Sequence, residues 1–490
     1  MKTYGQAHEI RDIIKNNRGP LVLASIAILG FALRIYRLGN PSLWFDELNT
    51  AGRANCPFFQ VIPRISDVAF PPLYYLLMSL WIGTFGNSEF SLRFPSLIFS
   101  TLSVIFIFKL SKELFGGRVG WFAALFASIS PISVYYAQEA KMYSMLWFFG
   151  ILSFLFFHRF SEGNKTGSLV SYVIFTTITI YTQYIGFIFI VIQNIFSVSL
   201  FRGTQLKKWL RGQLAILVLY LPWISKCLSH FIHRPGAGWI PKVDNYPHLL
   251  ALVFSRALTG KLSHNNVWEL CVYCLLIISA FVSVTDRGKR YSLDFGRNDY
   301  MLFLWIVTPI IVYGAINAGV CPMLSGRTTR YISFIYIPLC ILISKGINKY
   351  RVTLKAIIVI YLLCATFSYR LIPLYGYNYR VAQGDDWRGF SHQLQQRADK
   401  KSLLLTGLPS WVVSYYNEGY EIRFMDYLSV LESQPMENKP NSVFIIYRGR
   451  GIDTGDLRAR LRGYQLKEEY NKYPIGFVWF EKQRVKQAAP

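Results

Sequence analysis

Three acidic residues beside predicted membrane boundaries are the first candidates for chemistry. Asp46 and Glu47 are adjacent in the segment WFDE, and Glu139 lies in YYAQEAK. Acidic side chains are costly to desolvate at a membrane boundary, so those found there are usually paired or functional. One carboxylate can act as a general base on a hydroxyl group, while a second orients that group or helps to bind a divalent cation. Ordinary interfacial charge is the competing interpretation.

Basic residues in comparable positions suit a phosphate group. Lys141 follows Glu139 by two residues, and Arg327 and Arg330 lie in the segment SGRTTRY. The planar fork of an arginine donates two parallel hydrogen bonds that match the geometry of a phosphate. For the two arginines, anchoring to lipid headgroups is the alternative interpretation.

Three tyrosines near these charged residues are candidates for a substrate pocket. They are Tyr143, Tyr181 and Tyr184. Aromatic side chains also gather at membrane interfaces without any binding role. The aromatic belt therefore remains an alternative explanation for them.

The composition indicates the elements that must position these residues. The chain has 490 residues, of which 52% are hydrophobic and only 16% are charged, whereas about 25% of residues are charged in an average soluble protein. Several apolar blocks approach the roughly 20 residues that cross a bilayer, where only a helix satisfies its own backbone. We therefore predict an α-helical polytopic membrane protein. The net charge of +25 is assigned to loops that face lipid headgroups, and no nucleic-acid partner is expected.

Eleven transmembrane helices are predicted from the apolar blocks. The run Leu73–Phe85 is too short to span comfortably and is predicted to be an interfacial or re-entrant helix within a first outer loop, 37–92. The eleven predicted spans are 20–36, 94–111, 119–136, 143–158, 168–185, 186–201, 212–227, 265–284, 300–320, 331–345 and 353–369.

The distribution of Lys and Arg predicts the orientation. Short loops rich in these residues follow every second span, and such loops face the cytoplasm. The N-terminus is therefore predicted to be cytoplasmic, in a multi-pass protein of the plasma (inner) membrane. Counting Leu73–Phe85 as a span would place the basic loops outside, so we reject that alternative.

The last quarter of the chain has a different sequence pattern from the apolar blocks before it. Strand-like runs (SLLLTG, SVFIIYRG and GFVWFEK) alternate with polar, helix-compatible stretches such as FSHQLQQRADK, a pattern typical of a small α/β domain. An odd number of spans places this segment outside. We therefore expect a transmembrane domain over 1–369 and an extracytoplasmic soluble α/β domain over 370–490.

Several segments resemble a known family when they are taken together. The runs FALRIYRLGNPSLWFDELNTA, FPPLYYLLMSLWIGTFGNSEFSLRFPS, SPISVYYAQEAKMYSM and IYTQY resemble the bacterial GT-C-type membrane glycosyltransferases. Those enzymes are related to protein O-mannosyltransferases and to aminoarabinose transferase, and are glycosyltransferase family 39-like. The resemblance continues through RYISFIYIPLCILISKGI and DDWRGF, and so covers most of the chain.

The resemblance implies a GT-C fold and a glycosyltransferase that takes a sugar from a polyprenyl-phosphate carrier. It would transfer that sugar on the outer face to a glycan, lipid or protein acceptor, as an inverting hexosyl- or pentosyltransferase. It implies that Asp46 is the catalytic base, which Glu139 assists. We assign Glu47 a supporting role, and we assign donor phosphate binding to Lys141, Arg327 and Arg330. No organic cofactor is expected.

Three positions depart from the family pattern. Phe70 stands where a histidine often precedes the PPLYY run, Lys141 replaces an arginine, and Gln183 replaces a histidine. The first and third changes remove candidate metal ligands. A divalent cation held by Asp46 and Glu139 and a site without metal therefore both remain open.

A membrane transporter or flippase for a lipid-linked or anionic substrate is the alternative function. Transporters commonly contain internal repeats and helices broken near the bilayer midplane. The sequence shows no such repeat, and its candidate acids are predicted to share one face. A non-catalytic assembly subunit is a third possibility, which the presence of Asp46, Glu47 and Glu139 argues against.

Overall fold

The computed structural model describes residues 2–66, 71–233, 267–285, 290–319, 329–350, 353, 386–433, 435, 439–448, 453–472 and 475–483. The chain divides into two compact units, each built from segments far apart in the sequence. Unit 1 comprises Met1–Tyr36, Pro57–Leu80 and Arg93–Tyr369. Unit 2 comprises Arg37–Cys56, Trp81–Leu92 and Arg370–Pro490.

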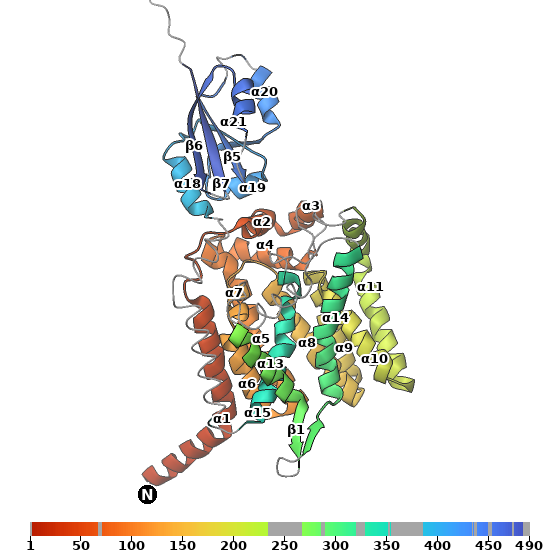
Figure 1. The fold of residues 1–490 in the computed structure, drawn as a ribbon. Helices are drawn as coiled ribbons and strands as arrows, with labels where there is room; N and C mark the ends of the chain where they lie inside the picture. The colour runs from red at the N-terminus through yellow and green to blue at the C-terminus, as the bar shows by residue number, and fades with distance from the viewer. Residues whose placement is uncertain are drawn as a thin grey trace, which may run out of the picture. The chain divides into compact units, whose positions relative to one another are not determined.

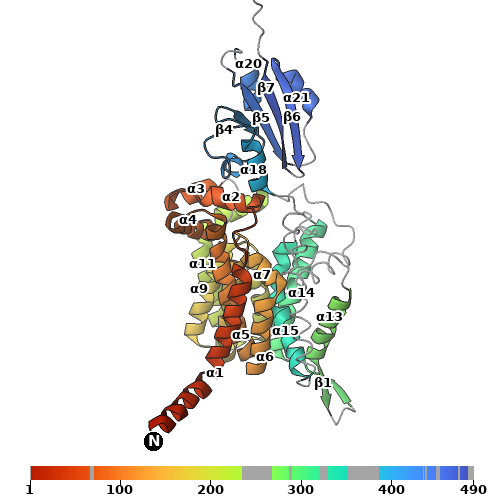
Figure 2. The same ribbon diagram turned by 90° about the vertical axis from the view of Figure 1, so that its left-hand side faces the viewer.

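Unit 1 is a bundle of helices with one small β-hairpin (Figures 1 and 2). Two helices, α4 (Leu73–Phe85) and α5 (Glu89–Phe115), begin or end in unit 2. The other elements of unit 1 are α1 (Lys2–Ile35), η1 (Phe58–Gln60), α3 (Val61–Ser66), α6 (Gly117–Ile129), α7 (Pro131–Ala137), α8 (Tyr143–Gly163), α9 (Thr166–Thr182), α10 (Gly186–Leu200), α11 (Gly203–His233), α13 (Val267–Phe281), β1 (Val282–Thr285), β2 (Arg290–Leu293), α14 (Arg297–Gly319), η2 (Thr329–Ile335) and α15 (Tyr336–Asn348).

Most predicted spans coincide with helices of unit 1. Within the described part of the chain, five helical segments are long and apolar enough to cross a membrane, or six if the bent pair α6 and α7 forms one span. The five are Glu89–Phe115, Tyr143–Gly163, Gly203–Ser229, Arg297–Ala315 and Arg330–Asn348. The predicted span 353–369 lies outside the described residues except for Thr353. The count of eleven therefore stays a prediction.

The predicted continuous span 119–136 is wrong in detail, because it is broken into α6 and α7 by a bend of 54°. Pro131 opens α7. A proline has no N–H to continue the hydrogen-bond ladder, and its ring clashes with the preceding turn. The break therefore leaves carbonyl groups at the end of α6 in need of new partners.

The guanidinium group of Arg34, near the end of α1, supplies those partners. Its side chain is fully buried. Two of its donors reach the last turn of α6, and the others reach α1, α5 and α7. The acceptors are Ala127 O (2.9 Å), Ser128 O (2.7 Å), Gly30 O (2.8 Å), Ser100 Oγ (2.8 Å) and Ser133 Oγ (2.7 Å). The Arg34 side chain thus donates hydrogen bonds to the free carbonyl groups at the end of α6 and connects the four helices α1, α5, α6 and α7.

At one end of unit 1, ion pairs join neighbouring helices; we call this end the ion-pair end. Lys345 Nζ lies 2.7 Å from Asp299 Oδ1, and both side chains are buried. Arg159 pairs with Glu113 at 2.5 Å. Since α8 begins at Tyr143 and runs toward this end, residues 138–143 lie at the opposite end. The turn between α9 and α10, and η2 before α15, share that opposite end.

Unit 2 contains a five-stranded mixed sheet in the order β4-β3-β5-β7-β6. The strand β3 pairs in parallel with both β4 and β5, while β7 pairs antiparallel with β5 and β6. The three strand-like runs noted in the sequence form β3, β5 and β7. The elements of this unit are α2 (Phe45–Ala54), α18 (Trp387–Gln395), β3 (Leu403–Thr406), α19 (Ser410–Ser414), β4 (Glu421–Phe424), α20 (Tyr427–Ser433), β5 (Ser442–Arg448), α21 (Thr454–Arg460), β6 (Tyr464–Lys472) and β7 (Ile475–Lys482).

The bonds of Arg34 lead to a stability prediction. Replacing Arg34 with Ala leaves several buried oxygen atoms without donors, and each unsatisfied group costs about 1–3 kcal/mol. We expect Arg34→Ala to lower the free energy of unfolding by about 3 kcal/mol or more, measured by denaturant unfolding in detergent. Arg118→Ala removes an exposed cation near the ion-pair end and is the control, with an expected change within about 0.5 kcal/mol. Equal stability of the two variants would contradict the role given to Arg34.

Candidate active site

The segment WFDE forms the first turn of α2 in unit 2. Asp46 and Glu47 therefore stand where the partial positive charge of a helix N-terminus favours a carboxylate. Glu47 is fully buried, and its Oε2 accepts a hydrogen bond from the backbone N–H of Trp44 at 3.3 Å. Asp46 is half-buried, and its carbonyl oxygen accepts from Thr50 Oγ1 at 3.1 Å. The structure gives Glu47 a helix-capping contact, which fits a supporting role.

Trp411, in α19, packs directly on α2. Its indole Nε1 donates to Asn49 Oδ1 at 3.1 Å, and the guanidinium carbon of Arg53 lies 5.1 Å from the centre of its ring. Gly52 permits this approach, because a Cβ atom there would lie 2.3 Å from the Trp411 ring. The C-terminal part of the chain therefore fixes the position of the helix that carries Asp46.

A second set of contacts holds the segment that leads into α2. The hydroxyl of Tyr416 accepts from the N–H of Leu43 at 2.9 Å and donates to Glu89 Oε1, also at 2.9 Å. Burial raises the pKa of Tyr416 well above its ordinary value, so the phenol stays neutral and can donate. Arg388 forms an ion pair with Glu89 and donates to Asn40 O at 3.2 Å. These contacts join all three segments of unit 2.

Arg448, at the end of β5, is a cation beside α2 that sequence reasoning missed. Its guanidinium carbon lies 4.8 Å from the centre of the Phe45 ring. Phe45 directly precedes Asp46. Only the folded sheet brings residue 448 to residue 45, so no local sequence signal could have indicated this proximity.

Glu139 and Lys141 lie in unit 1, in the connection between α7 and α8. They are only 2% and 8% exposed. The amide of Gln138 donates to the carbonyls of Arg34 (2.8 Å) and Tyr36 (2.9 Å). The hydroxyl of Ser96 in α5 donates to Lys141 O at 3.1 Å. Two helices thus hold this short acidic and basic segment at the end of unit 1 opposite the ion-pair end.

Aromatic rings support the same segment from within unit 1. The Tyr136 ring lies 5.0 Å from that of Tyr143 and 5.1 Å from that of Trp147. Trp147 in turn lies 4.6 Å from Tyr336. Tyr143, predicted to line a pocket, is itself buried in this cluster. Packing of this density restricts the positions open to Glu139 and Lys141.

Arg93 is a further candidate that the sequence analysis overlooked. It is fully buried near the start of α5. Residues three positions apart share one face of a helix, so Arg93 shares a face with Ser96, which contacts the Lys141 carbonyl. Arg93 therefore lies on the face of α5 that contacts residues 139–141. The sequence signal that could have indicated it is an arginine within the otherwise uncharged segment SLRFPS.

The two other predicted pocket tyrosines contact α11. The hydroxyl of Tyr181 donates to Leu219 O at 3.0 Å, and that of Tyr184 accepts from Trp223 Nε1 at 3.3 Å. These contacts fasten the turn between α9 and α10 to the neighbouring helix. A role of the two tyrosines in substrate binding stays a prediction.

One of the two predicted phosphate-binding arginines lies within the described part of the chain. Arg330 stands in η2, with its guanidinium carbon 5.4 Å from the Tyr331 ring, while Arg327 lies outside the described residues. The end of unit 1 that holds Glu139 therefore also holds Arg330.

The structure divides the predicted residues between the two units. Asp46 and Glu47 belong to unit 2, whereas Glu139, Lys141, Tyr143, Tyr181, Tyr184 and Arg330 belong to unit 1. Their assembly into one centre stays a prediction. Among the described residues, no group of three or more His, Cys, Asp or Glu side chains is placed to hold a metal ion. A cation shared by Asp46 and Glu139 would draw on both units and also stays a prediction.

Comparisons with solved structures decide the fold class. ArnT from Cupriavidus metallidurans in its apo state matches with a TM-score of 0.63 and 12% identity, covering 95% of this chain and 98% of that one. The chain has a GT-C fold. ArnT bound to undecaprenyl phosphate matches with a TM-score of 0.59 and 13% identity, covering 96% of this chain and 98% of that one. The Archaeoglobus fulgidus oligosaccharyltransferase matches with a TM-score of 0.51 and 10% identity, covering 97% of this chain and 76% of that one.

A family model supports the same class from the sequence. The model described as dolichyl-phosphate-mannose-protein mannosyltransferase matches residues 69–225 of this GT-C chain. No curated protein matches the chain by sequence. Together, the family model and the fold confirm the predicted resemblance to GT-C membrane glycosyltransferases.

The contact between Gly52 and Trp411 predicts whether Gly52→Ala stabilises or destabilises the protein. Helix propensity alone makes Gly→Ala stabilising by up to about 1 kcal/mol. At position 52 the new methyl group would collide with the Trp411 ring, so we expect Gly52→Ala to destabilise unit 2. Gly83→Ala in α4 is the matched control, since a Cβ atom there meets nothing within 4 Å, and it should be neutral or stabilising.

Thermal unfolding and limited proteolysis of the two purified variants measure this difference. Increased cleavage within residues 37–56 of Gly52→Ala, with the control intact, is the expected pattern. An Ala at position 52 that stabilises the protein as much as the one at position 83 would show that α2 and Trp411 are not in close contact.

Proposed function

We propose that this chain is a glycosyltransferase that moves a sugar from a polyprenyl-phosphate carrier to an acceptor hydroxyl on the outer face of a membrane. The observation that carries the proposal is the match to ArnT over almost the full length of both chains, including a structure of ArnT bound to undecaprenyl phosphate. The mannosyltransferase family model over residues 69–225 supports it independently.

The proposed reaction is a single displacement. The acceptor oxygen bonds to the anomeric carbon while the bond from that carbon to the phosphate oxygen breaks. The electron pair leaves with the polyprenyl phosphate, and the hydroxyl proton passes to Asp46. Attack opposite the leaving group inverts the anomeric carbon. Asp46 is assigned the base because it is half-buried at a helix N-terminus, whereas Glu47 caps that helix.

The cations are assigned to the donor side, and Glu139 is assigned to assist Asp46. Lys141 and Arg330 lie at the same end of unit 1, where positive charge would stabilise the leaving phosphate; we extend this assignment to Arg327 from its sequence position. Glu139 would assist by orienting the acceptor or by binding a divalent cation. One solved structure of the Archaeoglobus fulgidus oligosaccharyltransferase contains Zn and sulfate, with a TM-score of 0.50 and 12% identity.

The transporter or flippase alternative is not favoured by the interior of unit 1. A chain of polar side chains crosses α8, α9, α10 and α11. Tyr172 Oη donates to Gln193 Oε1 at 3.1 Å, and Gln193 Nε2 donates to Ser153 Oγ at 2.9 Å. Trp209 Nε1 donates to Asn194 Oδ1 at 3.0 Å. These residues carry no formal charge and bond one another, as polar contacts that join membrane helices do.

The base assignment predicts the effect of Asp46→Asn. Asparagine keeps the size of the side chain but cannot accept the proton, and general-base catalysis contributes about 10²–10⁴-fold. Turnover in a transfer assay should therefore fall by about that factor, while donor-lipid binding is retained. Glu47→Gln is the matched control, since its amide oxygen can still accept from Trp44, and it should lose less activity. Asp46→Asn turnover within about threefold of the parent would exclude Asp46 as the base.

The proposed orientation predicts accessibility to a membrane-impermeant thiol reagent. The chain contains seven cysteines, so the test begins from a variant without them. Asn40→Cys and Gln396→Cys should be labelled from outside intact cells. Lys207→Cys, near the basic N-terminal end of α11, should react only after the membrane is opened. Labelling of Lys207→Cys in intact cells would reverse the proposed topology.

A further inference from the structure

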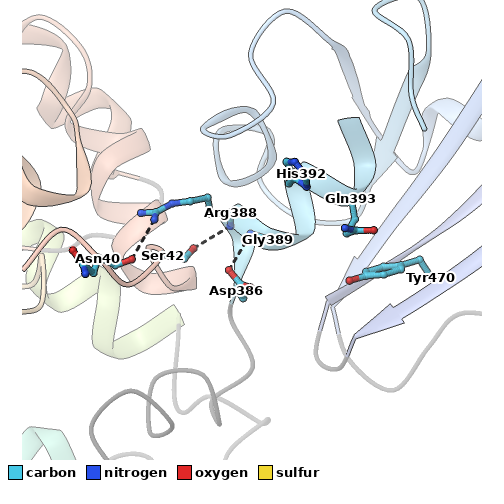
Figure 3. A pocket seen from close by; sticks show the side chains of 8 residues that line it. All are labelled: Asn40, Ser42, Asp386, Arg388, Gly389, His392, Gln393 and Tyr470. Atoms are coloured by element: carbon cyan, nitrogen blue, oxygen red, sulfur yellow. Dashed lines mark hydrogen bonds between the residues drawn. The ribbon is translucent and has the colours of Figure 1, made fainter. Parts of the chain in front are cut away.

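Unit 2 contains a cavity of about 470 Å³ between its N-terminal and C-terminal segments. This volume lies within the range of small-molecule sites. Figure 3 shows Asn40 and Ser42 on one side and Gln393 and Tyr470 on the other, with Asp386 and Arg388 between them. The lining residues are Asn40, Ser42, Asp386, Arg388, Gly389, His392, Gln393 and Tyr470.

The lining is unusual because it contains no aliphatic side chain. Ligand pockets are ordinarily mostly apolar, with a few polar groups that fix orientation. Here carboxamide, hydroxyl, imidazole and carboxylate groups offer both donors and acceptors. A ligand that matches this mixture must itself donate and accept at several neighbouring points. Sugar hydroxyl groups do so, since each carries one donor hydrogen and two acceptor lone pairs.

The charges of the cavity are already compensated within unit 2. The guanidinium of Arg388 forms an ion pair with Glu89, so the carboxylate of Glu89 already balances its positive charge. Asp386 Oδ1 accepts from the Gly389 N–H at 2.9 Å and caps α18. A paired cation and a single capping carboxylate give no excess of positive charge. The cavity therefore favours a neutral ligand over a phosphate.

Contacts behind the lining hold its shape. The N–H of Arg388 donates to Ser42 Oγ at 3.1 Å. Arg397 Nη1 donates to Gln393 Oε1 at 3.0 Å, and the Tyr470 ring stacks on Phe477 with centroids 5.2 Å apart. A binding site whose side chains are already positioned loses less entropy when the ligand binds.

We infer that this cavity binds a neutral, polyhydroxylated sugar ring that belongs to the acceptor. The inference deepens the proposed function and rests on it, because the acceptor was left open between a glycan, a lipid and a protein. Ser42 and Asn40 stand four and six residues before Asp46 in one short segment. A sugar ring held by this segment belongs to the substrate on which Asp46 acts.

The test measures the binding of methyl glycosides to the purified full-length protein by saturation-transfer NMR and titration. The probes are a panel of methyl hexosides and methyl pentosides, with inorganic phosphate as the anionic comparison. We expect at least one glycoside to bind more tightly than phosphate. Gln393→Ala and Tyr470→Phe should each weaken it by about 2- to 10-fold, the effect of one neutral hydrogen bond.

Two control variants separate the cavity from the catalytic step. Gln396→Ala, on an exposed residue that follows α18, should leave glycoside binding unchanged. Asp46→Asn should also bind the glycoside normally, even where transfer is lost. In the transfer assay, Gln393→Ala should raise the KM for the acceptor and leave the KM for the donor unchanged. Thermal unfolding verifies that each variant is folded.

Three results would overturn the inference: no glycoside binds, binding is indifferent to Gln393→Ala and Tyr470→Phe, or phosphate binds more tightly than every glycoside. Glycoside binding that depends on these residues in a chain without transferase activity would support the cavity and refute the proposed function. Sugar transfer whose KM for the acceptor is unchanged in both variants would support the proposed function and refute the cavity as an acceptor site.

Discussion

The burial of a single guanidinium group, that of Arg34, is the constraint on which unit 1 depends. A positive charge within a helical bundle is tolerated only when nearly all of its donors find acceptors. Arg34 finds five, two of them at the broken end of α6. The break in turn starts α7, and α7 leads into residues 138–143. The placement of Glu139 and Lys141 thus follows from a proline and a buried cation that lie elsewhere in the chain.

In unit 2 also, residues distant in the sequence position a candidate catalytic residue. The segment that carries Asp46 is short and has no hydrophobic core of its own. Trp411, Tyr416 and Arg388 supply its packing and hydrogen bonds, so its geometry derives from the sheet on which α18 and α19 are built. The core of that sheet is apolar, with Leu405, Ile445 and Val478 fully buried.

Apolar continuity in the sequence predicted most helices, because membrane helices must be both long and apolar. Apolar continuity did not predict the break after Ile129, although Pro131 is a local helix-breaking signal. The cation that stabilises the break lies some ninety residues earlier, where no local signal could indicate it. The strands β3, β5 and β7 were visible as apolar runs. The edge strands β4 and β6 were not, because β4 is largely exposed and β6 carries charged residues. The candidate acids were found from their residue types and segments, whereas Glu89 and Arg388 are 299 residues apart and only folding pairs them.

The composite construction of unit 2 also has a consequence for biosynthesis. A ribosome makes residues 37–56 hundreds of residues before it makes Trp411, Tyr416 and Arg388. During that interval α2 lacks the indole, phenol and guanidinium groups that later surround it. The segment bearing Asp46 therefore reaches its final arrangement only after synthesis of the C-terminal sheet. In a nascent chain, this segment therefore forms its contacts with Arg388, Trp411 and Tyr416 only after those three residues have been made.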